Sequence, residues 1–233
     1  MYVPSAVASN EIMGPDNGNG TIGPLEYRQL YVSGLPTRSF VRGVTAKPLA
    51  TVELEVHFAS GEGIDIDHAM RLVLEKVLDS RLAELRGKSA VTYGFSAVYD
   101  PRRAGGLWTI GGDADAARAG EAATALVTIL HEIRTDRESY RAAFVLGRQK
   151  VLEELLIGST SPAQIANLLA QLASFDLAET YYQALPRQVA SLTLTAFHEF
   201  VKRELDASGQ VFAAFGNEAA ATAAVAAARA VAP

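Results

Sequence analysis

The chain has 233 residues, 49% of them hydrophobic, and a formal net charge of -5. This length and composition allow a substantial buried core, as expected for one globular domain. The acidic balance leaves no basic surface large enough for nucleic acid, and the absence of cysteine excludes disulfide bonds and cysteine-ligated zinc.

Residues 1 to 24 are rich in Gly, Asn, Ser and Pro, and this composition predicts a flexible leader or linker. They lack the basic-then-apolar order of a signal peptide. No uninterrupted apolar run is long enough to span a bilayer, so we expect a soluble protein without a membrane span. The sequence does not indicate the cellular compartment, because a chain without cysteine folds in reducing and oxidising surroundings alike.

Residues 49 to 60 alternate between apolar and polar side chains, and this period of two predicts a half-buried strand. After a Gly61-Glu62-Gly63 turn, Asp65 or Asp67 is expected to cap a helix by accepting from its first N–H groups. That helix carries one apolar stripe, which would cover a sheet face: Met70, Val73, Leu74, Val77, Leu78, Leu82 and Leu85.

The next segment predicts a β-hairpin, with strands from Tyr93 to Tyr99 and from Leu107 to Gly111 around a turn that contains Pro and Gly. Asp113 or Asp115 is then expected to cap a helix that runs to about Arg134. Two acidic groups at a helix start repel an anion, so the adjacent glycine pair does not predict a phosphate site.

From 137 to 205 the periodicity is helical almost throughout, and Pro162 and Pro186 mark breaks. We expect four helices, at residues 137–157, 161–173, 176–185 and 193–205. A last strand is predicted at 210 to 216. The Ala-rich end, 219 to 232, has high helix propensity but little side-chain area to bury, so we expect a terminal helix that frays, or else one that docks on a partner.

This order of elements predicts an α+β domain with helices packed on one face of the sheet. We therefore divide the chain into a leader at 1–24, one domain at 25–218 and an Ala-rich tail at 219–233. Within the domain, the run Leu85-Arg86-Gly87-Lys88-Ser89-Ala90-Val91-Thr92-Tyr93-Gly94 ends the first helix and opens the hairpin. It brings the guanidinium of Arg86 and the phenol of Tyr93 to one end of the sheet, where a polar ligand could bind.

This run resembles the Leu-Arg-x-Lys-x-x-x-Thr-Tyr-Gly segment in the second, non-zinc half of the M16 peptidases, the family of pitrilysin, insulysin and the mitochondrial processing peptidases. In element order the resemblance extends over residues 27 to 218. It implies the M16 half-domain fold, with a mostly antiparallel sheet and an additional strand near residues 38 to 45. It also implies that Arg86 and Tyr93 hold a peptide substrate beside the zinc of the other half.

Both side chains can donate to a peptide carbonyl and stabilise the charge that develops when water attacks it. The residues alone also allow a simpler interpretation, in which Arg86 satisfies the last helix carbonyls and the Tyr93 hydroxyl is solvated at a strand edge. Lys88, between them, is expected to be solvated.

An M16 catalytic half carries His-x-x-Glu-His on a helix, and this chain has no such motif. No two of its histidines, His57, His68, His131 and His198, are four residues apart, so we expect structural roles for them. In particular, His131 and His198 are expected on polar helix faces. The sequence thus predicts no metal site and no complete active site in this chain, and the resemblance assigns the zinc to a partner half.

Two functions remain. In the first, the chain is the non-catalytic, substrate-binding half of an M16-type zinc metalloendopeptidase, inactive alone, whose zinc-bearing partner lies upstream in the same chain or in a separate subunit. In the second, it is a catalytically inert scaffold or peptide-binding subunit, as are the M16-like core subunits of the bc1 complex. Neither function determines whether the chain forms a homo-oligomer.

Overall fold

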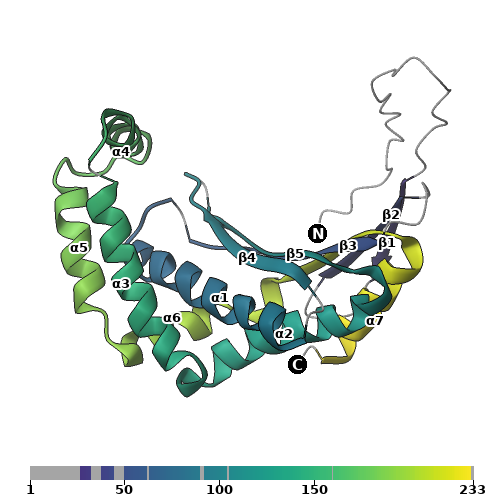
Figure 1. The fold of residues 1–233 in the computed structure, drawn as a ribbon. Helices are drawn as coiled ribbons and strands as arrows, with labels where there is room; N and C mark the ends of the chain where they lie inside the picture. The colour runs from purple at the N-terminus through teal and green to yellow at the C-terminus, as the bar shows by residue number, and fades with distance from the viewer. Residues whose placement is uncertain are drawn as a thin grey trace, which may run out of the picture.

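A six-stranded sheet forms one layer of the computed structural model, and helices cover one of its faces (Figure 1). The structure describes residues 27–32, 38–44, 50–61, 63–89, 92–103, 105–158 and 160–231. The predicted leader lies outside the described residues. The strands are β1 (Tyr27–Val32), β2 (Arg38–Val44), β3 (Thr51–Ala59), β4 (Thr92–Asp100), β5 (Leu107–Asp115) and β6 (Val211–Gly216). The helices are α1 (His68–Ser89), α2 (Ala119–Thr135), α3 (Arg141–Ile157), α4 (Pro162–Ser174), α5 (Tyr181–Ser191), α6 (Leu194–Glu204) and α7 (Glu218–Val231).

The strands lie in the order β1-β2-β6-β3-β5-β4, and all neighbours are antiparallel except β2 and β6. This arrangement confirms the α+β class, the mostly antiparallel sheet and the helices on one face. The strands predicted at 38–45 and 210–216 are β2 and β6, whereas β1 was not predicted from the sequence.

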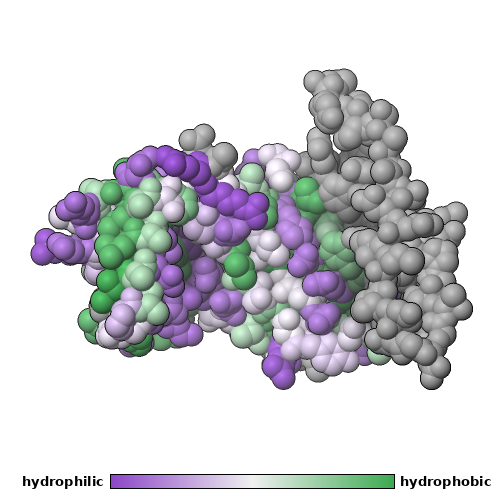
Figure 2. Space-filling view, turned by 90° about the horizontal axis from the view of Figure 1, so that it is seen from above, coloured by the Kyte–Doolittle hydropathy of each residue, from purple (hydrophilic) through white to green (hydrophobic). Residues whose placement is uncertain are grey.

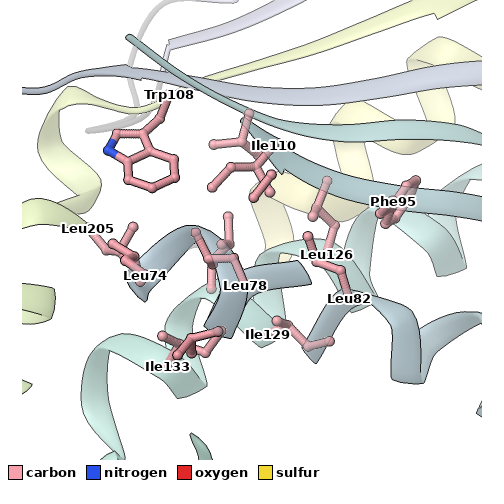
Figure 3. Close-up of a cluster of buried hydrophobic side chains, with 14 of the residues drawn as sticks. Leu74, Leu78, Leu82, Phe95, Trp108, Ile110, Leu126, Ile129, Ile133 and Leu205 are labelled. Carbon is pink, nitrogen blue, oxygen red and sulfur yellow. The ribbon is translucent and has the colours of Figure 1, made fainter. Parts of the chain in front are cut away.

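The core lies between the sheet and helices α1 and α2. The apolar residues of β3 are buried and alternate with more exposed ones, which confirms the half-buried strand. The predicted stripe of α1 points its leucines toward the β5 side chains (Figure 3), and α2 closes the layer from below. The labelled residues of this cluster are Leu74, Leu78, Leu82, Phe95, Trp108, Ile110, Leu126, Ile129, Ile133 and Leu205.

Strand β5 extends four residues beyond the predicted end at Gly111, because the glycine pair lies inside the sheet and not in a turn. Gly111 and Gly112 have φ values of 154° and 150°. A Cβ on Gly111 would lie 1.9 Å from the carbonyl oxygen of Leu54 on β3. Only glycine permits this conformation and close approach.

Asp113 is consequently a strand residue that pairs with Glu53 and caps no helix. Asp115 is the cap, because its carboxylate accepts from the N–H of Ala117, 2.8 Å away, at a short 3₁₀ turn before α2.

Three of the four helices predicted between 137 and 205 are confirmed as α3, with a 3₁₀ turn before it, α4 and α6. The fourth was misplaced. Helix α5 begins at Tyr181 and contains Pro186, where the sequence predicted an end. The proline removes one helical hydrogen bond, but Leu185 and Val189 on the same helix are fully buried, and this packing holds the helix across the break.

The Ala-rich end forms α7, which packs against α2, β2 and β6. Five of its residues are buried: Ala220, Ala221, Ala224, Val225 and Ala228. The expected fraying helix is therefore wrong. Small residues let two helices approach closely, and a Cβ on Gly120 of α2 would lie only 3.5 Å from that of Ala227. The domain boundaries at residues 24 and 218 stay predictions. Among the described residues, no helix is both long and apolar enough to cross a bilayer.

Candidate functional site

Arg86 lies in the last turn of α1, and its side chain is exposed. Among the described residues, its guanidinium has no hydrogen-bond or ion-pair partner. The simpler interpretation, in which Arg86 satisfies the last carbonyls of its own helix, therefore finds no support in these contacts. An exposed guanidinium can bind a carbonyl or carboxylate oxygen.

Tyr93 is the extra residue of a β-bulge. In the β4–β5 register, Thr92 pairs with Ala114 and Gly94 pairs with Asp113, which leaves Tyr93 without a partner. The odd-numbered residues that follow on β4 are buried, and strict alternation would bury Tyr93 as well. The bulge reverses the alternation, so Thr92 is buried and Tyr93 is 59% exposed. Bulges often redirect a side chain in this way beside functional sites.

Helix α1 is bonded to β4 by a carboxylate. The Oδ1 atom of Asp79 accepts from the N–H of Ala97 at 2.8 Å. Burial raises the pKa of Glu75, one turn earlier, and a hydrogen bond from the Tyr99 backbone opposes this change. Strand β4 ends the sheet, so these carboxylates satisfy backbone donors at its open edge. They fix the two elements that carry Arg86 and Tyr93 relative to each other.

The first turns of α1 contain a buried cation that the sequence pattern does not predict. Arg71 is only 2% exposed, and its Nε donates to Oε1 of Glu204 on α6 at 2.9 Å. The same oxygen accepts from Nε1 of Trp108 at 3.0 Å, and a second Arg71 nitrogen binds Asp65. Burial lowers the pKa of Arg71, but the hydrogen bonds to Asp65 and Glu204 raise it more, so the guanidinium is charged.

This Arg71 cluster is an anchor of the fold and lies far from the candidate site. Arg71 and Arg86 are roughly 22 Å apart along the helix, at 1.5 Å per residue. The only signal for this cluster in the sequence is a charged residue next to the apolar stripe of α1. Asp67, one of the two predicted caps, precedes α1 but binds Arg203 through its carboxylate at 2.8 Å, while Asp65 accepts from the N–H of Asp67.

The histidines have structural partners. His57 lies on the open face of the sheet between Thr109, 3.2 Å away, and Glu55, 2.8 Å away. His68 is buried, and its Nδ1 lies 2.7 Å from the hydroxyl of Tyr181. Burial, and then the charge of Arg71, lower the pKa of His68 to about 4.

His131 is exposed, as predicted. His198 is not on a polar face, because it is buried beside the hydroxyl of Tyr140 at 2.8 Å. This corrects the sequence-based expectation, since the helical pattern of α6 does not reveal that the 3₁₀ turn before α3 covers His198. Within the described part of the chain, no group of three or more His, Asp or Glu residues could hold a metal ion. The described residues therefore do not fit a zinc site.

A groove of about 580 Å³ lies between α1, α2 and α7 on the helical side of the molecule. Its lining includes Leu85 and Ile129, and Arg81 of α1 binds Glu84 on the same helix and Glu132 of α2. Neither Arg86 nor Tyr93 lines this groove. The two predicted substrate-binding residues instead lie on exposed surface.

Comparison with known proteins identifies the fold. No protein-family profile matches the sequence, and no curated protein matches it. The structure is similar to a peptidase M16 inactive domain from Pseudomonas fluorescens, with 20% identity and a TM-score of 0.63, over 73% of this chain and 42% of that chain. It is similar to the periplasmic protease PqqL from Escherichia coli, with 16% identity and a TM-score of 0.61, over 82% of this chain and 24% of that chain.

A third similar structure is a chain of Complex III2 from Candida albicans, with 10% identity and a TM-score of 0.62, over 80% of this chain and 49% of that chain. The resemblance to M16 half-domains is thus confirmed at the level of the fold. The present chain spans less than half the length of each of these three chains.

Proposed function

We propose that this chain is the non-catalytic, substrate-binding half of an M16-type zinc metalloendopeptidase. It closes over a peptide that is held on a zinc-bearing partner half. The observation that carries the proposal is the β-bulge, which turns Tyr93 outward soon after the helix end that exposes Arg86. The fold shared with an M16 inactive domain supports a half that relies on its partner for the metal.

In this function Arg86 and Tyr93 act on the carbonyl oxygen of the scissile peptide bond. Zinc on the partner half would supply the activated water. The guanidinium and the phenol both donate hydrogen bonds to the oxygen as negative charge develops on it. Because this charge is largest in the transition state, the two donors contribute more to the rate of cleavage than to peptide binding. The hydrogen bond from Ala97 to Asp79 supports them by fixing α1 against β4.

The test is cleavage of a quenched fluorescent peptide by this chain mixed with a candidate companion chain, a protein that carries His-x-x-Glu-His. We expect cleavage that needs both chains and zinc. Arg86→Ala and Tyr93→Phe should each lower kcat/KM tenfold or more, because each removes one donor to the oxyanion. Arg141→Ala is the matched control, since Arg141 is exposed and, among the described residues, pairs with Glu138 three residues earlier in the chain.

Equal cleavage by the Arg86→Ala and Arg141→Ala variants would contradict the proposal, as would cleavage by this chain alone. An inert scaffold is the second candidate, favoured by the shared fold with a chain of Complex III2. It predicts a stable association with the companion chain and no cleavage of any peptide by the pair.

A further inference from the structure

Strand β4 is an edge strand whose own residues do little to protect it. Among the described strands it pairs only with β5, so every second residue directs its backbone N–H and C=O groups away from the sheet. From Thr92 to Tyr99 the strand contains neither proline nor a charged residue, and aromatic and β-branched residues favour the extended conformation. An uncharged edge of this kind is a template for pairing with another strand.

Helix α1 covers this edge with two carboxylates. The helix packs against β4 (Figure 1). The Oδ1 atom of Asp79 accepts from the N–H of Ala97 at 2.8 Å, and Glu75 accepts from the backbone of Tyr99. Ala97 and Tyr99 are two residues apart on the strand, so both of their N–H groups point to the same edge, away from β5. Two successive outward donors of β4 are therefore occupied.

The spacing of the two carboxylates matches the spacing of the two donors. Glu75 and Asp79 are one helical turn apart, which places them about 6 Å from each other along the axis of α1. Ala97 and Tyr99 are about 6.8 Å apart along an antiparallel strand. Each carboxylate therefore reaches its own donor while the helix and the strand keep their regular geometry.

A neighbouring cation favours the charged form of one of these carboxylates. The Nζ atom of Lys76 lies 3.4 Å from Glu75 and 3.0 Å from Glu154 of α3. Its charge stabilises an ionised Glu75, and an ionised carboxylate accepts a hydrogen bond from a backbone N–H more strongly than a neutral group does. Helix α3 thus supports the contact between α1 and the edge of the sheet.

We propose that Glu75 and Asp79 close the β4 edge and keep it from pairing with the β4 edge of a second copy of this chain. Two such edges are self-complementary, because antiparallel pairing places the donors of each copy opposite the acceptors of the other. The surface over the sheet offers less apolar attraction, since Figure 2, seen from above, shows mostly purple and white residues there. This inference does not depend on the proposed function.

The first test is amide hydrogen exchange of the full chain, followed by NMR. Asp79→Ala should speed the exchange of the Ala97 N–H at least tenfold and change that of Tyr99 less than twofold, and Glu75→Ala should do the reverse. The N–H of Val98, which faces β5, is the internal control. Asp79→Asn and Glu75→Gln keep an oxygen acceptor and should keep the protection. Unchanged exchange in both alanine variants would overturn the proposal.

The second test is sedimentation velocity of the Glu75→Ala/Asp79→Ala variant, with circular dichroism to confirm that it is folded. We expect a species larger than the wild type, in an amount that rises with concentration. Addition of Val98→Lys, at a position that is 53% exposed, puts a charge on the strand and should restore the wild-type size.

A double variant of wild-type size would contradict the proposal. So would a larger species that persists after Val98→Lys, because the copies would then associate through another surface. Asp79→Ala alone opens one donor and gives the same comparison if the double variant does not fold.

Discussion

At the scale of single residues, two glycines differ in what limits a side chain at their position: local helix propensity at one, and a tertiary contact at the other. Gly87 lies in α1, and a Cβ there would meet nothing within 4 Å. Gly111 has a left-handed φ of 154°, and a Cβ there would collide with the backbone of β3. The same residue type is therefore a local weakness at Gly87 and a requirement at Gly111.

We predict opposite effects for the two alanine substitutions. Gly111→Ala should lower the free energy of unfolding by about 3 kcal/mol or more, because the strand must move or the backbone must strain. Gly87→Ala should raise it by roughly 0.5–1 kcal/mol through better helix propensity. Urea denaturation measures both. Equal effects would show that β3 and β5 do not approach each other closely at Gly111.

His68 makes stability depend on pH. Its pKa is about 4 in the fold, against 6.5 when unperturbed, so the unfolded chain binds a proton that the folded chain does not bind between these values. The contribution is complete above pH 6.5 and falls as the pH drops toward 4, by up to about 3 kcal/mol. His68→Gln should flatten the difference in unfolding free energy between pH 7 and pH 4.5. An unchanged slope would contradict a neutral His68 beside Arg71 and Tyr181.

At the scale of elements, the fold depends on bonds between segments far apart in sequence. Glu204 of α6 accepts from Arg71 of α1 and from Trp108 of β5, so it joins two helices and the sheet. Removal of Glu204 would leave the guanidinium of Arg71 in the core with only Asp65 to offset its charge.

We therefore predict that Glu204→Ala lowers the free energy of unfolding by about 3–5 kcal/mol, the usual cost of breaking a buried ion pair from one side. Glu199→Ala, on the same helix, removes an exposed ion pair with Lys202 and should change stability little. Thermal unfolding followed by circular dichroism compares them. Similar melting temperatures for the two variants would mean that the Arg71 cluster contributes no more than a surface pair.

Element types were easier to predict than their ends and environments. The period of two in β3 and the stripe of α1 led directly to the observed elements, because one buried face imposes a regular pattern on the sequence. The end of β5, the start of α5 and the packing of α7 were misjudged. In each case glycine, proline or alanine has a clear local preference, and a distant segment overrides it by close packing.

At the scale of the whole molecule, the chain presents one helix-covered face and one open sheet face (Figure 1). Arg86 and the Arg71 cluster lie toward opposite ends of α1, so a variant of one can be tested without removing the contacts of the other.

The sequence by itself determined the class of fold, the order of most elements and the identity of Arg86 and Tyr93 as candidates, because hydrophobic periodicity and a short motif are local properties. Only the tertiary structure decided that a bulge opposite Ala114 and Asp113 turns Tyr93 outward, that Arg71 is buried against Glu204, and that Asp79 of α1 binds the edge of β4. These features depend on which distant segment lies beside each residue, and that pairing is settled when the whole chain packs around one core.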